Sequence, residues 1–501
     1  MSAWQSWSSY RADEIWTLEL PRGGDLPWAL FYPADYSIGA ANLGIHYIFR
    51  ILKENGVAAE RFFSSPISYR SVDADTMLER FPIITAGISY EGGFVTFCEW
   101  LKGANIPLSP YEREKNSYPI LGVGGAISYI NPLLVSGISD FVVLGDAVDI
   151  LPYIIECMRE YMSCGDRRRL WNKLAENEYI LVPPLHLSGG GVEPRKLGRS
   201  IPIDDTYPMY SSWVTPRGAF GNTLLTELQR GCARSCSYCT LPGSFGKMRY
   251  RKFDIIKPEL DRILPLSGAA QIGLVTPEAG DYPDIEKLLY YIKSKNIGVS
   301  FASLRLDRLT EQMIDALTSG GRHSITVAPE SGSDSLRFSC GKKFTNDLII
   351  EKLIMAKSKG IDQVKLYFML GLPGETEEHV AAIADLSSRI IDITGQNLIL
   401  SVNPFIPKPG TPWKNESFAG IPQIRKKYNI LSSAVRAIKK KTPQLRITSP
   451  KEADTEYNLA WFGYNDSINI SLADSFFEYL KKCRSSQQKT LLDLKSLFPD
   501  K

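Results

Sequence analysis

Three cysteines, Cys232, Cys236 and Cys239, lie within eight residues of one another. Cysteine thiolates bind iron–sulfur clusters and zinc. A zinc site is normally completed by a fourth Cys or His, and the closest histidine upstream is His186. Three thiolates on a [4Fe–4S] cluster would leave one iron open for chemistry, as a catalytic zinc keeps one position open. We therefore predict a cluster held by these cysteines; a zinc site or three structural thiols is the alternative.

The cysteines follow the first of six apolar segments that alternate with helical patterns. We predict strands at residues 224–228, 271–275, 298–302, 324–328, 364–369 and 398–403. Strands that alternate with helices form parallel sheets, and six such units predict an open, partial (β/α)6 barrel. The working site of a β/α barrel lies at the carboxyl ends of its strands. The barrel must therefore position the cysteines together with whatever side chains end the other strands.

The first part of the chain also alternates strands with helices. Strands are predicted at residues 28–32, 82–86, 119–123 and 141–144, with helical patterns such as 42–54 and 94–103 between them. This pattern predicts a doubly wound, Rossmann-like α/β domain. Ligands of such sheets bind at the carboxyl edge, where the glycines Gly124, Gly125 and Gly145 would let the backbone approach closely.

The Cys-x3-Cys-x2-Cys spacing, with Tyr238 before the last cysteine, resembles the radical S-adenosylmethionine (SAM) superfamily. The resemblance covers about residues 220 to 415 and implies a [4Fe–4S] cluster and SAM as cofactors. It implies that Tyr238 lies near the adenine, and that Ser303 and Arg305 contact the methionine end of SAM. It also implies polar contacts from Glu330 and a fifth-strand motif around Gly371. Glu278 ends Thr276-Pro-Glu278, where the family often has Gly-Gly-Glu contacting the SAM amino group.

The first domain resembles the cobalamin-binding-like domains that precede some radical SAM cores. The segments that carry this resemblance are 36–44, 122–125 with Asn131-Pro132, and Leu144-Gly-Asp146. It implies cobalamin beside Tyr36, Ser37, Gly124, Gly125 and Gly145. Many such proteins carry Asp-x-His-x-x-Gly with a cobalt-ligating histidine, but here the stretch is Asp35-Tyr-Ser-Ile-Gly39. We expect the lower face of the cobalt to lack a protein histidine, and His46, within a predicted helix, to be structural.

The whole chain divides, on this interpretation, into a Rossmann-like domain (1–195), a radical SAM barrel (196–415) and a helical C-terminal region (416–501). The 501 residues are 44% hydrophobic, and the net charge of +3 is too small to indicate a nucleic-acid or membrane partner. No segment is apolar enough to span a bilayer, and the N-terminus does not read as a secretory signal. We expect a cytoplasmic protein. The basic run 425–441 is interpreted as a solvated helix face, with a docking surface as the alternative.

The leading functional prediction is a cobalamin-dependent radical SAM methyltransferase that methylates an unactivated carbon. The resemblance implies substrates that include protein side chains, such as a glutamine of methyl-coenzyme M reductase, and an electron donor such as ferredoxin or flavodoxin. One alternative is a methylthiotransferase acting on tRNA or protein, which needs three more cysteines in its first domain. That domain contains only Cys98, Cys157 and Cys164. The other alternative is an iron–sulfur electron-transfer or scaffold protein.

Overall fold

The computed structural model describes residues 6–116, 118–187 and 209–472, together with residues 487, 489, 490 and 494. Its first domain is a six-stranded sheet in the order β3-β2-β4-β5-β6-β7. The strands are β2 Leu26–Asp35, β3 Val57–Ser65, β4 Ile83–Gly87, β5 Ile120–Gly124, β6 Phe141–Val143 and β7 Ile180–Leu181. The first five run parallel and β7 is antiparallel. This is the doubly wound arrangement predicted from the sequence, with the flavodoxin-like strand order.

Helices cover both faces of this sheet and bury two separate apolar cores. The helix α3 and the helix α8 pack on one face, and α4 and α7 pack on the other. The helices are α1 Ser8–Ala12, α2 Tyr36–Gly39, α3 Leu43–Glu54, α4 Glu91–Gly103, α5 Pro110–Lys115, α6 Ile127–Ile130, α7 Leu133–Ser136, α8 Leu151–Cys164, α9 Arg167–Ala175 and α10 Pro183–His186. The start of α3 is set by Asn42, whose side chain accepts a hydrogen bond from the Ile45 amide.

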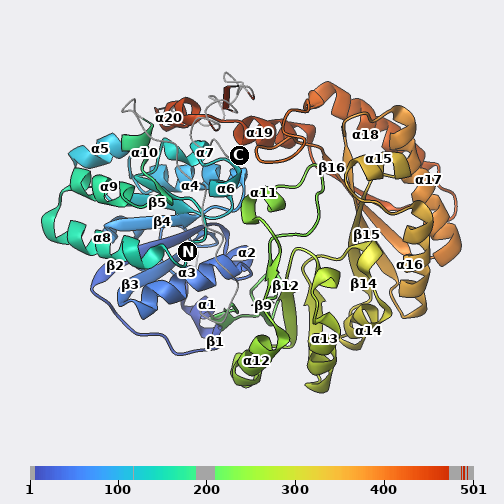
Figure 1. Ribbon diagram of the computed structural model, residues 1–501, viewed down its shortest axis with the longest axis horizontal. Helices are drawn as coiled ribbons and strands as arrows, with labels where there is room; N and C mark the ends of the chain where they lie inside the picture. The colour runs from blue at the N-terminus through green and yellow to red at the C-terminus, as the bar shows by residue number, and fades with distance from the viewer. Residues whose placement is uncertain are drawn as a thin grey trace, which may run out of the picture.

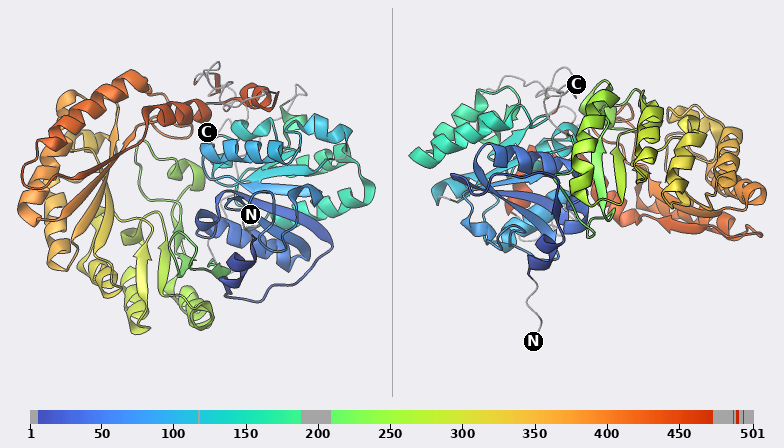
Figure 2. Two further views of the ribbon diagram at one scale, coloured as in Figure 1. Left: turned by 180° about the vertical axis from the view of Figure 1, so that it is seen from behind. Right: turned by 90° about the horizontal axis from the view of Figure 1, so that it is seen from below.

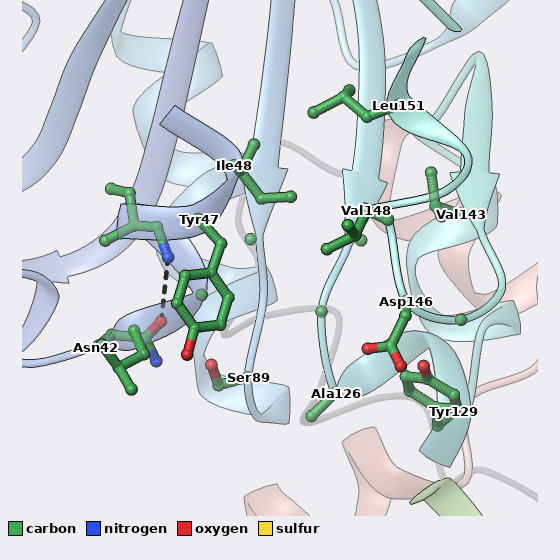
Figure 3. Close-up of a pocket in the computed structure, with 18 of the residues that line it drawn as sticks. Asn42, Tyr47, Ile48, Ser89, Ala126, Tyr129, Val143, Asp146, Val148 and Leu151 are labelled. Carbon is green, nitrogen blue, oxygen red and sulfur yellow. Dashed lines mark hydrogen bonds between the residues drawn. The ribbon is translucent and has the colours of Figure 1, made fainter. Parts of the chain in front are cut away.

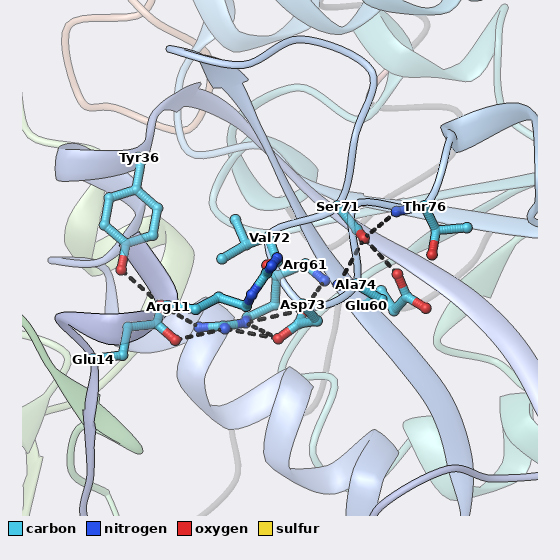
Figure 4. Close-up of polar contacts among 10 residues, drawn as sticks. All are labelled: Arg11, Glu14, Tyr36, Glu60, Arg61, Ser71, Val72, Asp73, Ala74 and Thr76. Carbon is cyan, nitrogen blue, oxygen red and sulfur yellow. Dashed lines mark hydrogen bonds and ion pairs between the residues drawn. The ribbon is translucent and has the colours of Figure 1, made fainter. Parts of the chain in front are cut away.

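A buried charge network fixes the N-terminal segment to this domain (Figure 4). The Arg61 guanidinium pairs with Glu14 at 2.8 Å and with Asp73 at 2.7 Å, and it lies over the Trp213 ring. Strand β1 (Ile15–Trp16) then pairs with β8 (Trp213–Val214), which precedes the second domain. Residues 14–16 therefore connect the first domain to the segment that leads into the second.

The second domain contains the six predicted parallel strands, arranged as an arc rather than a closed barrel (Figure 1). Strands β9 Thr223–Glu227, β12 Gln271–Val275 and β13 Gly298–Phe301 form one sheet. Strands β14 Ser324–Glu330, β15 Gln363–Leu370 and β16 Asn397–Pro404 belong to a second sheet. The two sheets share one apolar core beneath the outer helices. These helices are α12 Phe253–Ser267, α13 Ile285–Ser294, α14 Glu311–Ser319, α16 Asn346–Ser358, α17 Glu377–Thr394 and α18 Gly420–Arg436.

Shorter elements complete this domain around the cysteine segment. Helix α11 (Leu241–Phe245) and the hairpin of β10 (Gln229–Arg230) with β11 (Arg249–Tyr250) flank the cysteines. Helix α15 (Asp334–Ser339) follows β14.

The C-terminal region differs from the helical segment that the sequence predicts. It adds a strand, β17 (Gln444–Ile447), which pairs parallel to β16 and extends the second sheet. Helices α19 (Pro450–Ala460) and α20 (Tyr464–Leu472) then return to the first domain, as Figure 1 and Figure 2 show. There the Asn131 amide donates to the carbonyls of Ala460 and Phe462. Residues 188–208, whose glycine- and proline-containing composition predicts a linker, lie outside the described residues. None of the described helices is long and apolar enough to cross a membrane.

Candidate active site between the two domains

The three motif cysteines lie on one loop between β10 and α11. The Cys239 amide donates to the Cys236 carbonyl at 3.1 Å, which turns the loop on itself. The Arg234 amide donates to the Cys232 Sγ at 3.4 Å, and the Arg305 guanidinium lies 3.8 Å from the Cys236 Sγ. Both contacts would stabilise thiolates, so the donor set fits an iron–sulfur cluster.

Burial raises the pKa of Cys232 and of Cys239, so these thiols stay protonated until a metal replaces the proton. Within the described residues, no three Cys, His, Asp or Glu side chains surround a point suited to a single metal ion. A four-iron cluster differs, because each thiolate binds a separate iron. The geometry therefore suits a cluster better than the alternative zinc site.

A buried triad lies beside the cysteine loop. The Tyr238 hydroxyl donates to Glu330 at 2.6 Å, and the Lys342 ammonium also contacts Glu330 at 2.6 Å. Glu330 ends β14 with a backbone φ of +66°, which an L-residue adopts at a cost of about 1–3 kcal/mol. The strained backbone and its two partners aim the carboxylate toward the loop. Lys342 was not predicted from the sequence, because no motif marks it.

Three other residues predicted for SAM follow neighbouring strands of the arc. Arg305 pairs with Asp307 at 2.9 Å while it reaches Cys236. The Glu278 carboxylate accepts from the Gly280 amide at 3.0 Å, and its second oxygen is buried without a hydrogen-bond partner among the described residues. Burial raises the pKa of Glu278 to about 7. Ser303 lines a hollow of about 250 Å³ between β13 and β14.

Gly371 directly follows β15, and its amide donates to Glu375 at 2.7 Å. Its φ of +84° is a left-handed conformation that glycine adopts freely. The next residue, Leu372, shares a small apolar cluster with Tyr238. The structure thus places Tyr238 on the cysteine loop and brings Arg305 and Glu330 into contact with it. Glu278, Ser303 and Gly371 follow other strands of the same arc.

A cavity of about 500 Å³ lies at the carboxyl edge of the first sheet, and residues on either side of the cysteine loop border it. Figure 3 shows side chains of its first-domain wall. The first domain contributes Gly124, Gly125 and Gly145, as predicted for a cofactor edge, together with residues of α3 and α8. The second domain contributes Arg230 and Gly231, which immediately precede the cysteines. Most of the lining is apolar. A large ligand in this cavity would therefore contact both domains at once.

A charged cluster crosses the cavity wall from one domain to the other. Arg230 pairs with Asp146 of the first domain at 2.6 Å and with Glu227 at 2.7 Å. The second carboxylate oxygen of Asp146 is buried with no hydrogen-bond partner among the described residues. That oxygen is an unused acceptor at the cavity, so a ligand with amide or hydroxyl donors would satisfy it. Arg230 was not singled out in the sequence, although it lies two residues before Cys232.

Two residues predicted for the cobalamin site lie elsewhere. Tyr36 is fully buried, and its hydroxyl donates to Glu14 at 2.7 Å within the charge network of Figure 4. The Ser37 carbonyl accepts from the Ala219 amide at 2.9 Å. Neither residue lines the cavity. The structure assigns Tyr36 to the interior of the first domain, because Glu14 occupies its only polar atom.

His46 is structural, as the sequence predicts. Its Nδ1 accepts from the Ser212 amide at 3.1 Å, so its Nε2 carries the proton and donates to the Ala40 carbonyl. Burial lowers its pKa to about 3, and the ring stacks on Trp213. None of the four histidines, all among the described residues, lines the cavity.

The cysteines of the first domain do not form a second site. Cys98 is buried in one apolar core, whereas Cys157 lies in the core on the opposite face of the sheet. Cys164 is exposed at the end of α8. A second cluster, as the methylthiotransferase alternative requires, has no ligand set among the described residues of this domain.

Among known proteins, a ribosomal protein methylthiotransferase of Pseudothermotoga lettingae is 25% identical over 41% of this chain and 51% of its own. A protein of Methanocaldococcus jannaschii described as uncharacterized is 26% identical over 78% of this chain and 79% of its own. The chain thus spans about half of the methylthiotransferase.

Solved structures share the fold of both domains. The radical S-adenosylmethionine methyltransferase TsrM from Kitasatospora setae, solved with cobalamin and a [4Fe–4S] cluster, has a TM-score of 0.51 at 16% identity, over 77% of this chain and 73% of its own. The cobalamin-dependent enzyme OxsB has a TM-score of 0.50 at 14% identity, over 91% of this chain and 56% of its own.

The family comparison matches both parts of the chain. Residues 44–183 match the N-terminal region of radical SAM proteins, and residues 226–387 match the radical SAM superfamily, whose members use a [4Fe–4S] cluster and SAM. The second match includes the cysteine loop. Together the two matches show that the chain belongs to the radical SAM superfamily.

Proposed function

We propose that this radical SAM enzyme is a cobalamin-dependent methyltransferase that methylates an unactivated carbon. The observation that carries the proposal is the cavity, which is lined by the glycine loops of the first domain and by residues on either side of the cysteine loop of the second. A methyl donor in this cavity would lie beside SAM and the substrate, and such proximity lowers the barrier to transfer. TsrM, which shares the fold, is a methyltransferase solved with cobalamin.

When bound, the cluster and SAM supply reductive cleavage of the sulfonium, and cobalamin supplies the methyl group. The protein itself positions these groups and excludes water. Gly124 and Gly125 allow close approach of the backbone, and Asp146 offers an unused acceptor. On the other side Arg305 and Glu330 face the cysteine loop. The substrate class we propose is a protein side chain, such as a glutamine of methyl-coenzyme M reductase, with ferredoxin or flavodoxin as electron donor.

We propose further that no histidine ligates the cobalt. The polar side chains that the first domain turns toward the cavity are oxygen or amide groups, including Asn42, Tyr47 and Ser89 (Figure 3). These bind cobalt more weakly than an imidazole does. A weakly ligated lower face would ease the transfer of a methyl group to and from the metal.

Anaerobic purification with cobalamin, followed by mass spectrometry of the bound corrinoid, tests the proposal. In the A126W variant, an indole from the cavity wall would occupy the space, so we expect loss of corrinoid with unchanged iron content. The matched control is A437W, at an exposed position that ends α18. Absence of corrinoid from the wild-type protein under all conditions would refute the methyltransferase proposal.

Electron paramagnetic resonance of the cob(II)alamin form tests the ligand. We expect no nitrogen superhyperfine splitting from an axial imidazole. Such splitting, abolished by a histidine substitution, would show that the loaded protein rearranges to supply a ligand.

The similarity to methylthiotransferases makes that activity the second candidate. Iron content separates the two candidates: one cluster gives about four irons per chain, and two clusters give about eight. The positions of Cys98 and Cys157 in separate cores favour the lower number.

A further inference from the structure

The inner face of the second sheet is polar, although the interior of a closed barrel is normally packed with branched apolar residues. Side chains alternate along each strand, and Leu366, Leu400 and Val402 lie in the outer core beneath the helices. Lys365, Tyr367 and Ser401 therefore point to the inner side of the arc. The C-terminal strand β17 adds Arg446, which is in register with Ser401 and hence with Tyr367.

Two cations on this face have no acidic partner among the described residues. The Lys365 ammonium contacts the Tyr367 hydroxyl at 2.8 Å and lies 4.5 Å from the centre of its ring. The exposed Arg446 guanidinium donates a hydrogen bond to the Gln444 side-chain oxygen at 3.2 Å. By contrast, the lysines of the outer helix α18 are paired, Lys426 with Glu377 and Lys427 with Glu375.

The only carboxylate on the inner face of β9, that of Glu227, is already neutralised by Arg230. A third cation, Arg322, borders the hollow between β13 and β14. Its guanidinium donates a hydrogen bond to the Gln271 side-chain oxygen, which is uncharged. The inner face of β15–β17, all of which the structure describes, therefore carries positive charge without a paired acid. Charge of one sign along a concave surface attracts ligands of the opposite sign.

We infer that the inner face of β15–β17 binds an anionic group of the substrate, a carboxylate or a phosphate, between Lys365 and Arg446. Adjacent strands lie about 4.8 Å apart, so two long side chains separated by one strand can reach a common anion. Arginine provides paired N–H donors and lysine a point charge, a combination suited to either oxyanion. The Tyr367 hydroxyl lies beside the lysine and borders the hollow that also contains Ser303.

The position also sets a length for the substrate, and this step rests on the proposed reaction at the strand ends. Met369 packs in the same cluster as Tyr238 of the cysteine loop. It lies four residues beyond Lys365, or about 13 Å along the strand. An anion held by Lys365 and Arg446 would then lie on the order of 10 Å from the reacting carbon. Such a substrate is larger than a single amino acid whose own carboxylate is adjacent to the methylated atom.

The experiment uses the cluster-loaded, SAM-bound protein at low salt and titrates it with pyrophosphate or with citrate by calorimetry. We expect at least one of these anions to bind, and K365M and R446Q each to weaken its binding by about tenfold or more. The matched controls are K426M and R436Q, which remove the same charges from the outer helix α18. Iron content and thermal unfolding of each variant report whether its fold and cluster are intact.

The two anions distinguish the source of the ligand. Binding of pyrophosphate alone indicates a phosphate group, binding of citrate alone a carboxylate, and binding of both the shared oxyanion chemistry. The inference is overturned if neither anion binds at about 10 mM. It is also overturned if binding survives in the double variant that combines K365M and R446Q. SAM cleavage, measured on the same samples, tests the proposed function separately, because anion binding does not depend on turnover.

Discussion

Cys340 shows how the environment of a thiol determines its role. Its carbonyl accepts from the Ser237 amide at 3.1 Å, so it lies against the loop of the three motif cysteines. Burial raises its pKa to about 12, and burial also raises the pKa of Cys232 and of Cys239. What distinguishes Cys340 is its packing in an apolar cluster with Leu336, Leu372 and Phe405. Proximity to the loop therefore does not make Cys340 a fourth ligand.

Iron analysis of reconstituted variants tests this distinction. The wild-type protein should contain about four irons per chain, and the triple alanine variant of Cys232, Cys236 and Cys239 almost none. The C340A variant is the matched control and should retain the cluster. Equal iron content in the wild-type and triple variants would refute the assignment, and loss of iron in C340A would make Cys340 a ligand.

Glu278 should give the apoprotein a distinctive pH dependence. Its pKa is raised from the ordinary value of 4.5 to about 7 in the folded state. Between these values the folded protein binds a proton that the unfolded chain has released, so stability falls as the pH rises. The difference amounts to about 3 kcal/mol at most.

The comparison of wild-type and E278Q proteins isolates this effect from other titrating groups. The variant amide cannot ionise, so urea unfolding should show E278Q becoming relatively more stable as the pH rises from 5 to 8, by about 2–3 kcal/mol. A difference that stays constant over this range would show that Glu278 is ionised already at low pH.

The hairpin of β10 and β11 packs closely against the cysteine loop at a glycine, Gly231. Gly231 separates β10 from Cys232 and has a φ of +74°. A Cβ at this position would lie 2.5 Å from the Lys247 carbonyl oxygen, closer than two such atoms can approach. The hairpin and the loop can therefore pack together only when this residue has no side chain.

The G231A variant should lose stability and cluster occupancy. The left-handed conformation alone costs an L-residue about 1–2 kcal/mol, and the contact with Lys247 adds to that cost. G221A is the matched control, because Gly221 has a φ of +63° with no atom within 4 Å of its Cβ position. We expect G231A to be clearly less stable than G221A and to retain less iron. Equal effects would show that the loop adjusts without cost.

Apolar runs predict most of the parallel strands of both domains, because buried parallel strands read as continuous hydrophobic segments. Strand β3 was missed because Glu60 and Arg61 interrupt its pattern. Arg61 is nevertheless buried, since Glu14 and Asp73 neutralise it from distant parts of the sequence. Strand β17 likewise depends on its pairing with β16. Local patterns do not encode such partners, and for the same reason the sequence does not reveal that Tyr36 binds Glu14 rather than lining the cavity.

Three segments that are distant in the sequence meet at one half-buried lysine. Lys408, just after β16, pairs with Glu91 of α4 at 2.9 Å and with Glu456 of α19 at 2.7 Å. The Glu91 side chain is only 1% exposed, and Lys408 is its ion-pair partner from the other domain. This contact joins the first domain, the barrel and the C-terminal helix, and thereby helps to fix the two walls of the cavity relative to each other.

Removal of Lys408 should therefore weaken the association of the domains more than it disturbs either domain alone. In K408M the Glu91 carboxylate would remain buried without its cation. Removal of one partner of a buried ion pair typically costs about 3–5 kcal/mol of folding stability. The matched control K426M breaks an exposed pair with Glu377 and should cost less than about 1 kcal/mol. We expect K408M to unfold at a lower temperature, to expose α19 to limited proteolysis and to lose bound corrinoid while the barrel retains its iron. Because the cluster ligands lie on a single loop of the barrel, iron loss that parallels corrinoid loss would instead indicate that the contact stabilises the barrel itself.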